Sequence, residues 1–246
     1  VGLDERNILK KIFFDVIINL EEDLELSKFV LSLKFRKIIG VFINSKKELD
    51  YTSEGNYWFD MSKISKLGKK QADILKKKNN KTHRQIISEM LGIKNYQKYE
   101  PFIRLTKKQR LISTNFLRRY NLSRRDLVIG LNLGSADRWP KKLSFNKTVQ
   151  LIDSLHKQFN AKILLFGGPE EIARNREIVA SSKAYIIDTG CGNNLIEFPA
   201  LISLCNLFIT TDTLGLHLAL ALKRRTICLI GPTSFTEIDM YGFGEK

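Results

Sequence analysis

The stretch LVIGLNL, Leu127 to Leu133, is a short apolar run that ends at a glycine, Gly134. A run of this length and composition is typical of a β-strand that is buried on both faces. A helical pattern follows at 144–159, where apolar residues recur three and four positions apart. A second apolar run comes at 162–166. The order strand, helix, strand predicts two parallel strands joined by a crossover helix.

The same alternation continues along the second half of the chain. Further apolar runs, each preceded by a helical pattern, lie at 184–188, 207–210 and 226–230. Repeated strand–helix units predict an α/β domain in which helices cover a parallel sheet. Because ligands of such domains bind at the carboxyl ends of the strands, the polar loops that follow these strands form the candidate site.

The first half of the chain is less regular. We expect strands at 13–20 and 37–43, helices around 26–33, 82–91 and 106–120, and a loop with short extended pieces at 51–59. Thr82 with Gln85 three residues later is typical of a capping box at the start of a helix. The polar loop 121–126 is the expected boundary, which divides the chain into domains 1–122 and 123–246.

The chain has 246 residues and a formal net charge of +15. Its basic residues crowd two stretches: Lys66, Lys69, Lys70, Lys76, Lys77, Lys78 and Lys81 in one, and Arg104, Lys107, Lys108, Arg110, Arg118, Arg119, Arg124 and Arg125 in the other. This charge indicates either an anionic partner (nucleic acid, a membrane surface or a phosphorylated glycolipid) or a compositional bias toward lysine. A solvated face is the simpler interpretation of each stretch.

Several protein classes are disfavoured. No apolar run approaches the length needed to span a bilayer, and the first residues lack the order of a signal peptide. The three cysteines, Cys191, Cys205 and Cys228, have no metal-ligand spacing and predict free buried thiols in a reducing compartment. Neither a three-glycine dinucleotide fingerprint nor a Walker loop is present, which argues against an oxidoreductase or an ATPase.

The loops after the first two strands of the second half carry groups suited to a nucleotide. Ser135, Arg138 and Lys142 bring a hydroxyl and two cations to a small turn, a combination that suits a phosphate but also a solvated turn. In the next loop, a Gly-Gly turn precedes Glu170 and Glu171. A carboxylate there can bind ribose hydroxyls, whereas the same acids also stabilise a helix N-terminus.

The remaining loops offer hydrogen-bonding groups at helix starts. Asn193 suits either a cap or a ligand contact. At Asp212 and Thr213 a carboxylate and hydroxyls coincide with a helix start, whose free N–H groups can hold a diphosphate. Asp212 equally suits an N-cap, and His217 is more commonly a core histidine than a catalyst. A fifth loop, at 231–234, adds hydroxyls and a tight turn.

Taken in order, these loops resemble glycosyltransferase family 9, which includes the ADP-heptose:lipopolysaccharide heptosyltransferases. The motifs are Gly-Ser, Arg-Trp-Pro-x-Lys, Gly-Gly-Pro-Glu-Glu, Thr-Asp-Thr-x-Gly-x-His-x-Ala and Gly-Pro-Thr-Ser, all within residues 130–234. A weaker likeness extends to 14–20, 37–40 and 80–82. Each motif alone is unspecific, whereas their order and spacing together are not.

The resemblance implies an α/β fold of GT-B type, with two Rossmann-like domains that have parallel sheets, the N-terminal one incomplete here. It implies that 1–122 lies on the acceptor side and that 123–246 binds the donor. The implied activity is an inverting transfer of heptose or a related sugar from a nucleotide-diphosphate donor to lipopolysaccharide or another glycan, without a metal or other cofactor. We expect a cytoplasmic location, and peripheral contact to an anionic glycolipid at the inner face of the cytoplasmic membrane would suit the basic first half of the chain.

Matching positions imply a set of donor-binding residues. They are Ser135, Arg138 and Lys142 at the phosphates, Gly168 with Glu170 or Glu171 near the ribose, Asn193 near the base, Asp212 at the sugar, Thr213 and Gly215 at the diphosphate, His217 behind that loop, and Gly231 and Thr233 at the last turn.

The chain also departs from the family pattern. Leu214 stands where the family has glycine, with Gly215 one place late, and Leu143 with Ser144 replaces a usual tryptophan. No residue matches the aspartate that the family is thought to use as its general base. We expect that base upstream of Val1, and we expect the chain to be a fragment that lacks the family's N-terminal start and C-terminal end.

Three other functions are compatible with these patterns. A degenerate GT-B module would bind nucleotide or glycan without turnover, and a GT-B epimerase would convert its sugar without an acceptor. A basic nucleic-acid-binding protein would show a steep salt dependence, although the sequence contains no recognised nucleic-acid motif.

Overall fold

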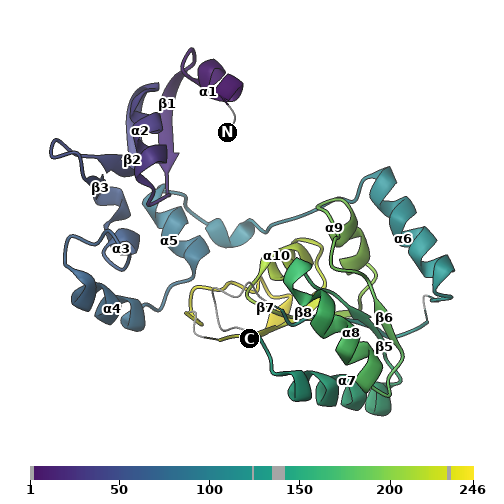
Figure 1. The fold of residues 1–246 in the computed structure, drawn as a ribbon. Coiled ribbons are helices and arrows are strands. Elements are labelled where there is room, and N and C mark those ends of the chain that lie inside the picture. The colour runs from purple at the N-terminus through teal and green to yellow at the C-terminus, as the bar shows by residue number, and fades with distance from the viewer. Residues whose placement is uncertain (1–2, 124, 135–141, 232–233) are drawn as a thin grey trace. The chain divides into compact units, whose positions relative to one another are not determined.

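The computed structural model describes residues 3–123, 125–134, 142–231 and 234–246 (Figure 1). Its internal contacts divide the chain into two compact units. Unit 1 consists of residues 1–98 together with 236–239, and unit 2 consists of residues 99–235 together with 240–246.

Unit 2 is built on a parallel sheet of six strands in the order β6-β5-β4-β7-β8-β9. The strands are β4 (Val128–Asn132), β5 (Lys162–Leu165), β6 (Ile186–Asp188), β7 (Leu207–Thr211), β8 (Arg225–Leu229) and β9 (Gly244–Glu245). The five strands expected from the apolar runs are confirmed, and the short β9 is an addition. The predicted parallel α/β domain is therefore the architecture of this unit.

Helices cover both faces of this sheet, because alternate strand residues point to opposite sides. Ile129 and Leu131 of β4 pack toward α7 (Phe145–Phe159) and α8 (Ile172–Ser181). Val128 lies in the other cluster, toward α6 (Lys107–Arg119), α9 (Glu197–Ile202) and α10 (Leu214–Ala221) (Figure 1). Burial on both faces explains why the strand sequence is apolar throughout.

The predicted boundary at 121–126 falls inside unit 2, because α6 packs against α9. The buried Ser113 hydroxyl of α6 donates a hydrogen bond to the carbonyl of Ala200, 2.8 Å away. A full capping box holds the start of the same helix, with Thr106 and Gln109 bonding to each other's backbone. The polar loop that looked like a linker is thus a turn between two elements of one unit.

Unit 1 contains a three-stranded sheet in the order β1-β2-β3. Its strands are β1 (Phe13–Asn19), β2 (Lys34–Ile43) and β3 (Leu49–Tyr51), and its α-helices are α1 (Leu3–Leu9), α2 (Leu24–Leu31), α3 (Asn56–Phe59), α4 (Lys69–Lys78) and α5 (His83–Met90), with 3-10 turns η1 (Ser53–Gly55) and η2 (Tyr96–Lys98). β1 and β2 are parallel, as expected, whereas β3 pairs antiparallel with β2.

The expectation of a loop with short extended pieces at 51–59 is only partly confirmed, because Tyr51 ends a short strand but η1 and α3 occupy most of the segment. Tyr51 ends β3 and Phe59 ends α3, and both side chains are buried with Val41 of β2 and Met90 of α5. Single aromatic residues between polar ones show no regular period, so their shared burial is invisible in a local pattern.

The segment 236–239 is bound to unit 1 by charged contacts. Lys76 of α4 forms an ion pair with Glu237 at 2.9 Å, and Arg84 of α5 forms one with Asp239 at 2.8 Å. The backbone N–H of His83 donates to the carbonyl of Glu237. Unit 1 is therefore assembled from two stretches that lie far apart in the sequence.

The start of α5 forms only part of the capping box that the sequence predicts. Thr82 accepts a hydrogen bond from the N–H of Gln85 at the start of α5, but the Gln85 side chain donates to Glu89, so half of the predicted capping box forms.

No helix within the described part of the chain combines the length and the apolar character that a membrane span requires.

Replacing Gly130 with alanine should destabilise unit 2. A Cβ atom at this central position of β4 would lie 2.5 Å from Cδ2 of Phe208 and 2.7 Å from Sγ of Cys205, inside a closed core. Overpacking of this kind costs roughly 1–3 kcal/mol, which urea unfolding monitored by circular dichroism would measure.

The matched control is Gly192→Ala, because a Cβ atom at Gly192 has no neighbour within 4 Å. This variant should change the free energy of unfolding by less than about 0.5 kcal/mol. Equal losses for the two variants would contradict the close packing of β4 against β7.

Candidate functional site

The carboxyl ends of β4 and β7 form the point where the strand order of unit 2 reverses. From β4 the chain proceeds to β5 and β6 on one side, and it then returns to β7 and β8 on the other side. Loops that leave two neighbouring strands in opposite directions open a crevice between them, and this is where doubly wound sheets bind ligands. Gly134 follows β4 and Asp212 follows β7, so both lie at this point.

Asn132, the last residue of β4, joins the two strand ends. Its side chain is 8% exposed, and its amide nitrogen donates to the hydroxyl of Thr210 at 3.2 Å and to that of Thr213 at 3.1 Å. A buried amide is stable only when its hydrogen bonds are made, so these contacts hold the loop after β7 against β4.

The start of α10 lies directly after this loop. Thr213 has the extended backbone of an N-cap, but its side chain makes no capping hydrogen bond to the helix, because Asn132 engages its hydroxyl. The first-turn N–H groups of α10 therefore lack a side-chain cap, which is the arrangement that helix starts use to bind anions.

The glycine displaced by one position has a structural explanation. A Cβ atom on Gly215 would lie 2.6 Å from Nδ2 of Asn132. A glycine is therefore required at position 215, where the backbone passes close to the Asn132 amide, and not at the exposed position 214. The Leu214 side chain is 52% exposed. Gly215, which was predicted as a donor-binding residue, is buried and lies against Asn132 and Phe198.

The loop after β4 is tied to both neighbouring strand ends. The hydroxyl of Thr211 donates to the carbonyl of Gly134 at 2.9 Å. On the other side, a Cβ atom at Gly134 would lie 2.6 Å from Cδ of Glu171. Gly134 thus passes between β7 and a buried carboxyl group, and a larger residue would displace one of them.

Glu171 ends the 3-10 turn η3 (Pro169–Glu171) after β5 and points into the protein. It is 6% exposed, and its Oε2 accepts a hydrogen bond from the N–H of Gly168 at 2.9 Å. Its Oε1 lies 3.3 Å from Nζ of Lys142, with which it forms an ion pair. A buried carboxylate is costly without such partners, so the pair fixes the position of the lysine.

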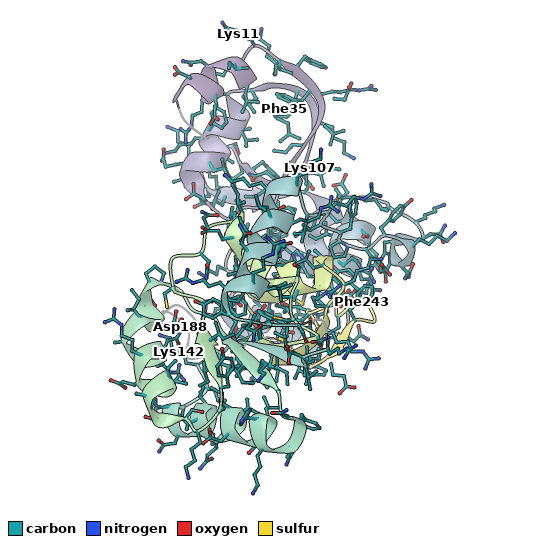
Figure 2. All side chains as sticks on the ribbon, turned by 90° about the vertical axis from the view of Figure 1, so that its right-hand side faces the viewer. Lys11, Phe35, Lys107, Lys142, Asp188 and Phe243 are labelled. Atoms are coloured by element: carbon teal, nitrogen blue, oxygen red, sulfur yellow. The ribbon has the colours of Figure 1, made fainter. Side chains whose placement is uncertain are left out.

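These contacts separate the two glutamates that the sequence left as alternatives. Glu171 is buried between Gly134 and Lys142, whereas Glu170 is exposed at the same edge. Of the two, Glu170 has the accessible carboxylate that a contact to ribose requires. Lys142, labelled in Figure 2, keeps 27% of its side chain exposed.

The other predicted residues have varied environments. The Asn193 amide nitrogen donates to the carbonyl of Gly190 at 2.9 Å, and so braces its own loop. His217 is exposed on α10, so the interpretation as a core histidine is wrong, and Gly231 is exposed after β8. Three predicted residues lie outside the described residues: Ser135, Arg138 and Thr233.

The cysteine nearest the site is unsuited to nucleophilic chemistry. Burial raises the pKa of the Cys191 thiol, and the negative charges of Asp188 and Glu171 act in the same direction. A protonated thiol is a poor nucleophile and a poor metal ligand. Cys205 and Cys228 are buried free thiols, as predicted.

Sequence reasoning missed Asn132 and Thr211. Asn132 is the single polar side chain in the apolar run 127–133, and a polar residue in a doubly buried strand needs a partner. That signal was present. No comparable signal marks Thr211 in the sequence, because threonine is common at strand ends in any sheet.

Comparison with known proteins gives a consistent result. The model of glycosyltransferase family 9 (heptosyltransferase) matches residues 6–243. Lipopolysaccharide heptosyltransferase 2 of Escherichia coli K12 is 29% identical over 109 residues, which cover 43% of this chain and 30% of that protein. The chain thus matches less than a third of the length of this relative.

Solved structures show the same fold. A glycosyltransferase family 9 protein from Veillonella parvula superposes with a TM-score of 0.73 at 20% identity, over 97% of this chain and 63% of that one. The E. coli heptosyltransferase WaaC with ADP-2-deoxy-2-fluoro heptose superposes with a TM-score of 0.54 at 16% identity, over 98% and 67%. The expected α/β fold of GT-B type is confirmed.

Removing the Glu171 carboxyl group should destabilise unit 2. Glu171→Ala deprives the Gly168 N–H of its acceptor and removes the ion pair between Glu171 and Lys142, and the loss of such a buried partner costs roughly 1–3 kcal/mol. Denaturant unfolding measures the change. Glu170→Ala removes the same group at an exposed neighbouring position and should cost less than about 0.5 kcal/mol. An equal effect of the two substitutions would contradict the assignment.

Proposed function

Because the chain belongs to glycosyltransferase family 9, the heptosyltransferase family, we propose that unit 2 binds a nucleotide-diphosphate sugar and that the whole protein transfers this sugar to lipopolysaccharide or another glycan. The observation that carries the proposal is a cation and an uncapped helix start at the reversal point of the strand order: Lys142 and α10.

Both groups suit the departing nucleoside diphosphate. When the sugar leaves, negative charge develops on the phosphate oxygen, and donors already in position stabilise that charge without reorganising. Lys142 is positioned by Glu171, and an ammonium group has three N–H donors, so it can bind the carboxylate and a phosphate together. The N–H groups of the first turn of α10 supply further donors.

The remaining contacts follow from what each side chain offers. Glu170 is exposed and is assigned to the ribose hydroxyls, while Asp212, after β7, is assigned to the sugar. Asn193 is assigned to the base through its carbonyl oxygen, since its amide nitrogen braces the loop. Ser135, Arg138 and Thr233 stay candidates for the phosphates and the last turn.

We infer an ADP-linked heptose or a related sugar as the donor, because the similar WaaC protein was solved with ADP-2-deoxy-2-fluoro heptose. The proposed reaction inverts the anomeric centre and uses no metal, so the diphosphate charge is met by protein groups alone. The acceptor is proposed to bind on the side of unit 1, in the cytoplasm at the inner face of the cytoplasmic membrane.

Two substitutions should separate the phosphate contact from the ribose contact. Lys142→Ala removes a charge-assisted hydrogen bond and should weaken both ADP and inorganic pyrophosphate by about 10- to 100-fold. Glu170→Ala should weaken ADP by a similar factor and leave pyrophosphate unchanged, because pyrophosphate has no ribose. Isothermal titration calorimetry of both ligands provides the measurement.

Lys147→Ala is the control, because this lysine is exposed on α7 and its loss changes the net charge equally. It should leave both affinities within about twofold, as expected for a screened surface charge. If Lys142→Ala and Lys147→Ala behave alike, the diphosphate does not bind at Lys142. Absence of ADP binding at millimolar concentration contradicts the proposal as a whole.

Turnover separates the transferase from its alternatives. With ADP-heptose and a lipopolysaccharide acceptor, the transferase should release ADP only when the acceptor is present and should give a product of inverted anomeric configuration, as nuclear magnetic resonance would show. An epimerase would change the donor sugar without acceptor. A binding module would retain ADP-heptose unchanged.

A further inference from the structure

The outer face of α6 is a strongly basic surface of unit 2, here named the α6 basic face. The charged and apolar residues exposed on it are Lys107, Lys108, Arg110, Leu111, Arg118 and Arg119. The opposite side of the helix is buried, with Gln109 and Ser113 turned toward α9. Figure 2 shows α6 on the outside of its unit, with Lys107 labelled at the first turn.

The cations of this face lack acidic partners within the described residues, where Arg119 lies over the ring of Tyr120 at 5.5 Å from its centroid. Residues 101–125 contain no aspartate or glutamate. None of the basic residues of the face forms an ion pair with a carboxylate of the described residues, whereas Lys66, Lys76 and Lys81 of unit 1 each do. Charge that finds no internal partner raises the electrostatic potential over the face and attracts anions.

Leu111 of α6 lies among these basic side chains. Positions four and seven apart share one side of a helix, so Lys107, Leu111 and Arg118 lie along the same line. Leu111 is 59% exposed on this line, and Phe102, just before the helix, is 71% exposed. Neither side chain contributes to the core of unit 2, so packing does not explain why apolar groups stand among cations.

We propose that the α6 basic face docks on the surface of an anionic lipid bilayer. Lysine and arginine near such a surface are attracted to acidic headgroups over about 10 Å, and an apolar side chain between them can enter the boundary of the acyl chains. The helix of 13 residues is about 20 Å long, which allows several headgroups to be contacted together.

The leucine favours a bilayer over a nucleic acid. Phosphates of DNA or RNA would be bound by the cations alone, and an aliphatic side chain at the centre of the face would be left against water or phosphate. In the interfacial region of a bilayer the same side chain is buried, which adds a hydrophobic contribution to the electrostatic one.

The α6 basic face is also better suited than the other basic helix. In α4 the lysines share the helix with Asp73, and Lys76 is engaged by Glu237. The α6 basic face has no acidic neighbour in its own stretch. This inference goes beyond the proposed sugar transfer, because no residue of the face is assigned to the donor, and each of the two can fail without the other.

Vesicle flotation tests the proposal with the full chain. Vesicles of phosphatidylcholine with about a third phosphatidylglycerol should carry the protein at low salt, and vesicles of phosphatidylcholine alone should not. Replacing Lys107, Lys108, Arg110 and Arg118 with glutamine should weaken binding to the anionic vesicles at least about tenfold. ADP affinity, measured on the same samples, should stay unchanged and would report a folded unit 2.

The matched control replaces four exposed lysines of α4 with glutamine: Lys69, Lys70, Lys77 and Lys78. It removes the same charge, and vesicle binding should stay within about threefold of the unmodified chain. Leu111→Gln should weaken vesicle binding about fivefold while the salt dependence stays the same, because it removes no charge.

Three outcomes would overturn the proposal. One is no binding to anionic vesicles at low salt. Another is an equal loss in the α6 and α4 variants, which would show that net charge alone attracts the protein. The third is tighter binding of a DNA duplex that displaces the vesicles, which would make the face a nucleic-acid surface.

Discussion

β4 pairs with β5 on one edge and with β7 on the other, and the remainder of unit 2 depends on this double pairing. A strand that is hydrogen-bonded on both edges and covered by helices on both faces can hold almost no polar side chain. It also fixes where the chain turns back, because the chain leaves β4 toward β5 and leaves β7 toward β8, in opposite directions along the sheet. The crevice that carries the candidate site is a consequence of that reversal.

Buried polar groups then determine the shape of the loops around the crevice. Asn132 holds the turn before α10, and Glu171 holds the turn after β5 together with Lys142. Both side chains are almost fully enclosed, so an unmade hydrogen bond would cost more than a surface contact contributes. The glycines at 134 and 215 belong to the same arrangement, because each leaves room for one of these side chains. The backbone around the phosphate site is therefore set by residues that need not touch the ligand.

Lys142 and the α6 basic face hold positive charge of unit 2 in two different physical settings. Lys142 is partly enclosed and paired with a carboxylate, so its charge acts at short range on a ligand in the crevice. The cations of the α6 basic face are exposed and form no ion pair with a carboxylate of the described residues, so they act over a longer range and are screened by salt. Lys142 therefore suits a small anion in the crevice, whereas the α6 basic face suits an extended anionic surface.

The sequence by itself determined the order and type of elements in the second half, because apolar runs and helical periods are local and each strand is buried on both faces. The order of the loop motifs indicated the family for the same reason, since each loop follows its strand directly. Only the tertiary structure decided that Glu171 is buried and Glu170 exposed, and that Gly215 lies against Asn132. It also decided that α6 belongs to unit 2 and that the segment 236–239 belongs to unit 1. These facts depend on contacts between residues far apart in the chain, such as Ser113 with Ala200 or Arg84 with Asp239, and no local pattern contains them.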